Sequence, residues 1–219
     1  MTTLARLKTS IDAWLTRDDV AVSGSDFPEI LLIAESCLAR KLRLIVQEVT
    51  TTLVFTGRTQ DLPANFLEQR MPFIDDNFRK FEYLTPQALR EHSGWSNSRA
   101  ATYYTLEGSA DAVAADDRVK MVIAGPASAE NPLSVDVNYW RRFPALTDDT
   151  DTNWLLVNHY DIYLYACLRA ACEYIQEHEL EDRYATKFDK YVEDQNKLEN
   201  RKRYGATPKR SSNSPRSIV

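Results

Sequence analysis

The spacing of apolar residues changes twice along this chain of 219 residues, and that change constrains its fold more than any other feature. Near both ends, apolar side chains recur every three or four positions, which predicts amphipathic α-helices. Between the ends the period falls to two, as in "LSVDVNYW" (133–140), where alternate residues from Leu133 to Tyr139 are apolar. A bundle of helices from both ends, with a β-rich insert between them, satisfies both patterns.

Two helices are expected in the N-terminal block. Apolar residues recur at helical spacing between Leu4 and Leu15, with Thr2 or Thr3 as a cap. The second helix begins at Asp26, and Glu29 three residues later completes a capping-box pattern. The short Ser/Gly loop between these helices predicts an antiparallel pair.

The C-terminal block returns to the helical period. The acidic run 148–152 precedes a helix and is interpreted as capping it. Residues 153–179 predict one helix or a broken pair, and residues 181–203 predict another helix. In that last helix the expected apolar stripe is Tyr184, Phe188, Tyr191 and Leu198.

Short strands are expected in the middle of the chain. Besides 133–140, the candidates are 48–57, 66–75, 80–84, 101–108 and 118–125. One short helix is expected at 85–93, with Thr85 as its cap and Pro86 at its first position. Turn signals about every ten residues predict an antiparallel sheet of modest size.

These patterns together predict an α+β fold. Helix pairs from the two ends form a helical bundle, and a small antiparallel β domain is inserted between them. The expected boundaries are a helix pair at 1–45, the β-rich insert at 46–145, the helices completing the bundle at 146–204 and a flexible basic tail at 205–219. The tail is rich in Gly, Pro and Ser, and such a segment is expected to be disordered when alone in solution.

Sites for catalysis, metals or cofactors are not indicated. The three His are His92, His159 and His178, and Cys167 and Cys172 lie five positions apart, about 140° around a helix, so they would not converge on one ion. The chain has no G-x-S-x-G, phosphate-binding loop or G-x-G-x-x-G motif, and its acidic clusters lack the spacing of a calcium loop. We therefore expect no enzyme and no cofactor.

The cellular setting follows from two further features. The three cysteines, the third being Cys37, are an odd number without framework spacing, which favours a reducing compartment and free thiols. No run of 18 apolar residues and no basic start followed by an apolar block is present, so neither a membrane span nor a secretory signal is expected.

Charge is distributed unevenly along the chain. The whole chain carries −5 and the segment 200–219 carries +6 with no acid, so residues 1–199 carry −11. An acidic body lacks the electrostatic footprint of a general nucleic-acid binder. The basic residues of this segment are Arg201, Lys202, Arg203, Lys209, Arg210 and Arg216.

Aromatic residues are concentrated in "NWLLVNHYDIYLYACLRAACEYI" (153–175). Its apolar stripe suffices to bury one helix face, and Tyr160 and Tyr163 fall largely off that stripe. Tyrosine is enriched where protein surfaces meet. The candidate subunit-interface residues are Trp154, Tyr160, Tyr163 and Tyr165.

Several segments, taken in order, resemble the head-to-tail adaptor (connector) proteins of tailed bacteriophages. They are "TTLARLKTSIDAWLTRDDV" (2–20), "LLIAESCLARKLRL" (31–44), "LPANFLEQR" (62–70), "TPQALRE" (85–91), "TYYTLEG" (102–108) and, most densely, "FPALTDDTDTNWLLVNHYDIYLYACLRAACEYI" (143–175). The resemblance covers about residues 3–200. Tyr160 departs from it, standing where the family usually has Pro, and segment 108–132 is unlike the family's β region.

This resemblance implies a non-enzymatic structural protein of the virion, assembled in the host cytoplasm and located at the head–tail junction. Such adaptors form a dodecameric ring below the portal protein, extend the DNA channel and give tail, nozzle or stopper proteins a platform. Genomic DNA would pass through without specific binding, which an acidic wall favours. The family's C-terminal region reaches toward the portal, so the six basic residues of 200–219 are the candidate portal contacts.

A different function is also open on the sequence alone. The basic C-terminal segment could make this chain a nucleic-acid-binding phage accessory protein. Only one aromatic residue, Tyr204, accompanies those charges, so such binding would be weak and sensitive to salt.

Overall fold

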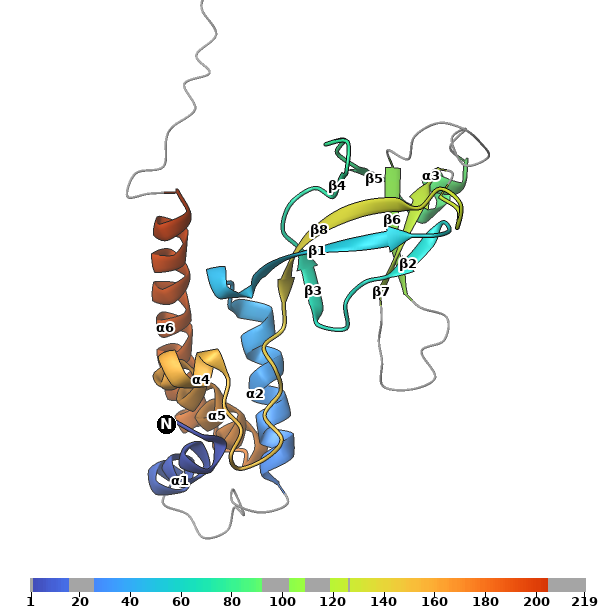
Figure 1. Cartoon of the computed structure of the whole chain (residues 1–219). Coiled ribbons are helices and arrows are strands. Elements are labelled where there is room, and N and C mark those ends of the chain that lie inside the picture. Colours follow the sequence, from blue (N-terminus) through green and yellow to red (C-terminus); the bar gives the residue numbers. More distant parts are fainter. Residues whose placement is uncertain (1, 16–25, 92–102, 109–118, 126, 205–219) are drawn as a thin grey trace, which may run out of the picture. The chain divides into compact units, whose positions relative to one another are not determined.

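The computed structural model of this chain describes residues 2–15, 26–91, 103–108, 119–125 and 127–204. The chain divides into two compact units (Figure 1). Met1–Ile45 with Pro144–Val219 forms what we call the helical unit, and Val46–Phe143 forms the insert. The α+β fold, with helices of both ends packed together and β structure inserted between them, is confirmed. The predicted tail 205–219 lies outside the described residues.

Helix α5 (Tyr160–Tyr174) is the centre of the helical unit. It packs against α1 (Leu4–Leu15), α2 (Phe27–Lys41), α4 (Trp154–Asn158) and α6 (His178–Tyr204) (Figure 1). All residues from 162 to 168 and from 170 to 172 are therefore buried. The expectation that Tyr163 lies off the buried stripe is wrong, because neighbouring helices cover α5 on more than one face.

Helices α1 and α2 do not form the expected antiparallel pair. Each packs instead on α5, and α1 lies across the direction of α2 (Figure 1). The predicted capping box is also absent, since Asp26 has a helical backbone conformation and makes no side-chain cap hydrogen bond to α2. Pro28 in the first turn and the burial of Phe27 fix the start of this helix instead.

The acidic run 148–152 stabilises a loop and does not cap the helix that follows. The carboxylate of Asp151 accepts hydrogen bonds from the Thr147 and Asp148 N–H groups, each at 2.8 Å. Backbone oxygens of Asp149 and Asp151 accept the first N–H groups of α1, which would otherwise be unpaired. The cap of α4 is Asn153, whose Oδ1 accepts the Leu156 N–H at 2.9 Å.

Residues 153–179 form a broken pair of helices. The break is at His159, which has φ −136° and ψ 58°, and α5 begins at the next residue. After α5, Gln176 takes a left-handed conformation with φ 60°, a frequent way to end a helix. Helix α6 then starts at His178, three residues before the predicted start.

The apolar stripe predicted for α6 is only partly buried. Tyr184 and Phe188 are buried as expected, followed by Val192. Tyr191 and Leu198 are exposed, so their assignment to the core is wrong. Nearer its C-terminal end, α6 buries Gln195 and Glu199 instead of apolar residues.

The described residues of the insert form two four-stranded sheets where one antiparallel sheet was expected. The first has the order β1 (Glu48–Phe55), β8 (Leu133–Arg141), β3 (Phe66–Gln69), and β4 (Ile74–Asp75) also pairs with β8. The second has the order β2 (Thr59–Asp61), β7 (Val119–Ala124), β6 (Tyr103–Gly108), β5 (Glu82–Tyr83). All pairs are antiparallel except the parallel pair of β5 and β6.

Both sheets contribute to one apolar core. The alternation predicted for 133–140 is confirmed, since Val135, Val137 and Tyr139 are buried there. They pack with residues of the second sheet, including Tyr104 and Met121.

The short helix α3 (Pro86–Glu91) follows β5, and its first turn is capped by the Thr85 hydroxyl as predicted. A 3-10 turn at Ile45–Gln47 leads into β1.

Candidate interaction surface

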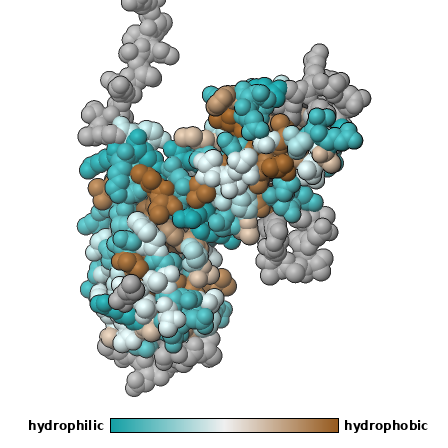
Figure 2. All heavy atoms as spheres, in the orientation of Figure 1, coloured by the Kyte–Doolittle hydropathy of each residue, from teal (hydrophilic) through white to brown (hydrophobic). Residues whose placement is uncertain are grey.

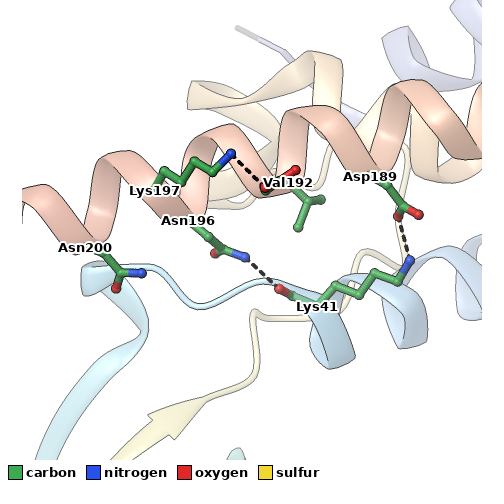
Figure 3. Close-up of a pocket in the computed structure, with 7 residues that line it drawn as sticks. Lys41, Asp189, Val192, Asn196, Lys197 and Asn200 are labelled. Carbon is green, nitrogen blue, oxygen red and sulfur yellow. Dashed lines mark hydrogen bonds and ion pairs between the residues drawn. The ribbon is translucent and has the colours of Figure 1, made fainter.

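The C-terminal half of α6 is held to the end of α2 by polar side chains. Asn196 accepts the Arg43 N–H at 3.1 Å through its Oδ1, and its Nδ2 donates to the Lys41 carbonyl at 2.9 Å (Figure 3). Three residues further along α6, Glu199 accepts the Ile45 N–H at 2.8 Å. Because α2 ends at Lys41 and the chain then runs extended, these backbone groups have no helical partner.

Arg203 extends this row by another turn of the helix. Its guanidinium donates to the Arg43 carbonyl at 3.1 Å and to Asn200 Oδ1 at 3.1 Å. We call the contacts of Asn196, Glu199 and Arg203 with residues 41–45 the polar clamp. Spacings of three and four place all three side chains on one face of α6.

Glu199 is the most buried member of the polar clamp, with 3% of its surface exposed. Besides the Ile45 N–H, it accepts hydrogen bonds from Lys202 at 2.6 Å and from Gln195 at 3.3 Å. Burial acts to raise the pKa of Glu199, but the hydrogen bonds from Lys202 and Ile45 outweigh it and hold this pKa below its ordinary value. The carboxylate is therefore ionised at neutral pH and accepts all three of these hydrogen bonds.

Next to the polar clamp lies a groove of about 500 Å³ between α6 and the end of α2 (Figure 3). Lys41 and Asp189 form an ion pair at 2.5 Å on its border, and Lys197 pairs with Glu193 at 2.6 Å. These pairs are solvent-exposed, so each contributes little to stability. Besides these two ion pairs, the lining includes the apolar Val192 and the neutral Asn196 and Asn200.

The basic residues predicted to contact the portal divide into three groups. Arg201 is exposed at the end of α6. Lys202 and Arg203 are engaged within the chain, one with Glu199 and the other in the polar clamp. Lys209, Arg210 and Arg216 lie outside the described residues.

The four aromatic residues predicted for a subunit interface differ in how far they are exposed. Trp154 is 39% exposed, and the half-buried Tyr160 donates its hydroxyl to Ser10 Oγ at 2.6 Å. Tyr163 is buried, and its hydroxyl donates to Glu35 at 2.6 Å. Tyr165 is buried among other rings. Of the four, Trp154 and Tyr160 keep surface that another subunit could contact.

Tyr165 is the centre of an aromatic cluster that the sequence did not reveal. Its ring stacks on Tyr191 at 5.4 Å and meets Trp14 edge-on at 5.8 Å. Trp14 and Tyr191 are partly exposed, so the cluster reaches the surface. Tyr191 and the exposed Leu198 lie seven positions apart and therefore share one face of α6. Figure 2 shows hydrophobic residues as brown patches among hydrophilic surface.

Glu35 joins three segments beneath the surface of the helical unit. Its carboxylate accepts the Tyr163 hydroxyl and the Leu146 N–H, linking α2, α5 and the chain before α4. Burial raises the pKa of Glu35 above its ordinary value, although both hydrogen bonds act to lower it. Burial also raises the pKa of the Tyr163 hydroxyl. This pair thus joins packed elements of the helical unit.

The side chains considered as metal ligands, Cys167, Cys172 and His159, are packed within the helical unit. Burial raises the pKa of the Cys167 thiol, and that of Cys172 to about 11. Burial lowers the pKa of His159, whose ring contacts Trp154. Within the described ranges, no three His, Cys, Asp or Glu side chains are grouped so that they could hold a metal ion. The described helices include none both long and apolar enough to span a membrane.

Comparison with protein families gives a match over almost the whole chain. Residues 2–213 match the family model described as SU10 adaptor protein. The match includes the helices of both ends and the insert between them. No curated protein is significantly similar to the chain.

Proposed function

This chain belongs to the SU10 adaptor protein family of phage head-to-tail adaptors, and from that membership we propose that it is a structural virion protein of the head–tail junction. The observation that carries the proposal is the extent of the match, which includes both units and most of the C-terminal segment. The family is structural rather than catalytic. Its partners are the portal and tail proteins.

The proposed form of the adaptor is a dodecameric ring below the portal. The ring extends the DNA channel and gives tail, nozzle or stopper proteins a surface on which to assemble. The exposed aromatic residues Trp14, Trp154 and Tyr191 support lateral contacts between subunits, because aromatic side chains are enriched at such interfaces. The −11 charge on residues 1–199 supports a channel that does not retain DNA.

The proposed contact with the portal lies at the C-terminal segment. Arg201, Lys209, Arg210 and Arg216 remain the candidate contacts to acidic groups of the portal. Lys202 and Arg203 support this contact indirectly, because they help to fix the end of α6. The polar clamp thereby gives the segment after Tyr204 a defined starting point.

Binding to purified portal tests this proposal. The full chain should co-elute with portal rings in size-exclusion chromatography, whereas a chain that ends at Tyr204 should elute alone. The truncation leaves every described helix in place, so its circular dichroism spectrum should keep the helical signal. Arg201→Glu should weaken the complex, while Lys197→Glu, an exposed charge reversal one turn earlier, should not. Equal portal binding by all four proteins would contradict the proposed contact.

The nucleic-acid alternative has less support. Two of the six basic side chains on which it depends are engaged within the chain, and the helical unit and insert carry excess acid. A gel-shift assay at two salt concentrations distinguishes the two functions. Tight, salt-resistant binding of DNA or RNA would favour the alternative.

A further inference from the structure

A small pocket on the helical unit, between α2 and α5, contains a thiol and charged side chains. Its volume is about 210 Å³, and Cys37, Arg40, Arg169 and Glu173 line it. Cys37 has a free thiol and is partly exposed, whereas the other two cysteines of the chain are buried. Pockets that enclose a whole ligand measure about 300–1,000 Å³, so this one has room for one end of a small molecule.

The two helices bring these side chains together by their spacing. Cys37 and Arg40 are three positions apart and share one face of α2, while Arg169 and Glu173 are four apart and share one face of α5. The two helices pack against each other. The rest of the lining is Ile33 and three alanines, whose short side chains leave the space open.

Arg169 connects the two faces of the pocket. Its Nη1 donates a hydrogen bond to Cys37 Sγ at 3.3 Å. Its Nε is buried and has no hydrogen-bond partner in the part of the chain that the structure describes. Buried polar atoms are nearly always paired, so this donor indicates an acceptor that the chain itself does not supply.

Arg40 adds a second guanidinium with capacity to spare. Its Nε donates to the Ser36 carbonyl at 3.1 Å, and its terminal nitrogens have no partner among the described residues. A guanidinium fork of this kind binds a carboxylate with two parallel hydrogen bonds. Glu173 contributes the opposite charge to the same pocket, and it is ion-paired with neither arginine.

This set of groups favours one chemical class of ligand. The guanidinium groups suit carboxylates, the Glu173 carboxylate suits an ammonium group, and the thiol suits a partner with a sulfur atom. Small zwitterionic thiol peptides of the glutathione class carry all three. A purely anionic ligand such as phosphate would be repelled by Glu173 and would leave the thiol unused.

We propose that Cys37 is a modification site that forms a mixed disulfide with a small zwitterionic thiol of the glutathione class. The Cys37 thiol gives its proton to water, and the thiolate attacks one sulfur of that compound's disulfide form. The old S–S bond breaks, and the other half leaves as a thiolate that takes up a proton. Cys37 is oxidised and the leaving sulfur is reduced, so no further oxidant is needed.

The two arginines have different parts in this reaction. Arg169 offers a charged hydrogen bond to the attacking sulfur. Arg40 lies at the pocket without touching the sulfur in the structure, so it binds the incoming carboxylate. The site is independent of the proposed ring, because all of its groups belong to the helical unit of one chain.

Mass spectrometry of the intact chain after incubation with glutathione disulfide tests the proposal. We expect one adduct per chain, located at Cys37 by peptide mapping, absent from Cys37→Ser and removed by reduced glutathione. The neutral hydroxyethyl disulfide serves as the reference reagent. The chain carries −5, which by itself disfavours the anionic glutathione disulfide. Faster reaction with glutathione disulfide than with the neutral reagent would therefore come from the pocket.

Arginine variants separate ligand binding from structural effects. Arg40→Gln should slow the reaction with glutathione disulfide about fivefold and leave the reaction with the neutral disulfide unchanged. Arg169→Gln should slow both reactions, because Arg169 acts on the sulfur. Arg183→Gln changes an exposed arginine of α6 that does not line the pocket, and it should change neither rate.

Two results would overturn the proposal. One is the absence of an adduct on Cys37, or adducts spread over all three thiols of the folded chain. The other is a wild-type rate with glutathione disulfide that is no faster than with the neutral reagent and is the same in Arg40→Gln. That result would show an accessible thiol without a binding pocket.

Discussion

Replacement of Glu199 by alanine should destabilise the helical unit by about 2 kcal/mol. Glu199 is nearly fully buried and accepts hydrogen bonds from the Ile45 N–H, Lys202 and Gln195. Alanine leaves the Ile45 N–H without this acceptor and removes one of the three side chains of α6 that bond to residues 41–45. A hydrogen bond to a charged group contributes about 1.5–3 kcal/mol, which sets the scale.

The lost pair with Lys202 adds little to this figure. Lys202 is 63% exposed and is solvated again when its partner is removed. A matched control is available on the same helix, because Glu193 is exposed and forms a surface pair with Lys197. Glu193→Ala should therefore change the free energy of unfolding by less than about 0.5 kcal/mol.

Urea unfolding followed by circular dichroism at 222 nm measures both changes. Among the described α-helices only α3 belongs to the insert, so this signal reports mainly on the helical unit. With a slope of about 2 kcal/mol per molar urea, Glu199→Ala should lower the midpoint by about 1 M. Equal midpoints for Glu199→Ala and Glu193→Ala would refute the reasoning that the polar clamp stabilises α6.

The pH dependence of this effect has a definite sign. The folded protein holds the pKa of Glu199 below its ordinary value of 4.5, so folding favours the carboxylate. Its contribution to stability is complete above pH 4.5 and decreases as the pH falls through the folded pKa. The stability difference between wild type and Glu199→Gln should accordingly shrink on acidification below pH 4.5. A difference that grows on acidification would contradict this sign.

Three further predictions concern groups elsewhere in the chain. Ellman's reagent should react with Cys37 in the native monomer and with the fully buried Cys167 only after unfolding; rapid reaction of every thiol would contradict the packing around α5. Glu35→Gln should raise the midpoint of urea unfolding at pH 7 but not at pH 4. Burial raises the pKa of Glu35 in the folded protein, so the ionised carboxylate lowers stability at pH 7, and glutamine avoids this cost. A lower midpoint at pH 7 would count against this sign. Asp75→Ala should speed tryptic cleavage within the turn of residues 74–80 at least tenfold, because two N–H groups and a guanidinium lose their acceptor, whereas Asp76→Ala should not; equal rates would show that Asp75 does not hold this turn.

The sequence predicted the type of each major element better than its packing. Alternating apolar residues marked the strand within 133–140, because one face of its sheet must be buried, and the other candidate segments also proved to contain strands. The strand Thr59–Asp61 was missed, since three polar residues carry no such alternation. The second sheet was missed because the sequence of one strand does not show which other strand it pairs with. The parallel pairing of β5 with β6 joins only two residues of each strand.

Burial was predicted poorly where a helix is covered from several directions or held by polar groups. The apolar stripe of α5 pointed to one buried face, but neighbouring helices bury Tyr163 as well. In α6, Tyr191 and Leu198 have the spacing of a core stripe, yet Gln195 and Glu199 are buried in their place. Glu199 accepts the backbone N–H of Ile45, 154 positions away in sequence, and Gln195 bonds to Glu199; periodicity does not reveal such partners.

The candidate site was predicted from sequence only in part. The basic residues 201–203 were identified by their charge, but charge does not reveal that Lys202 and Arg203 bond within the chain. The aromatic cluster around Tyr165 was not predicted either, because it joins residues of α1, α5 and α6 that are far apart in sequence. Both failures concern contacts between segments that are distant in sequence.

Negative-stain electron microscopy of the protein mixed with portal from the same phage tests the central claim most directly. The protein alone serves as the reference, at concentrations well above micromolar. The adaptor function predicts twelvefold rings stacked on one face of the portal. Bare portals beside small monomers would contradict it.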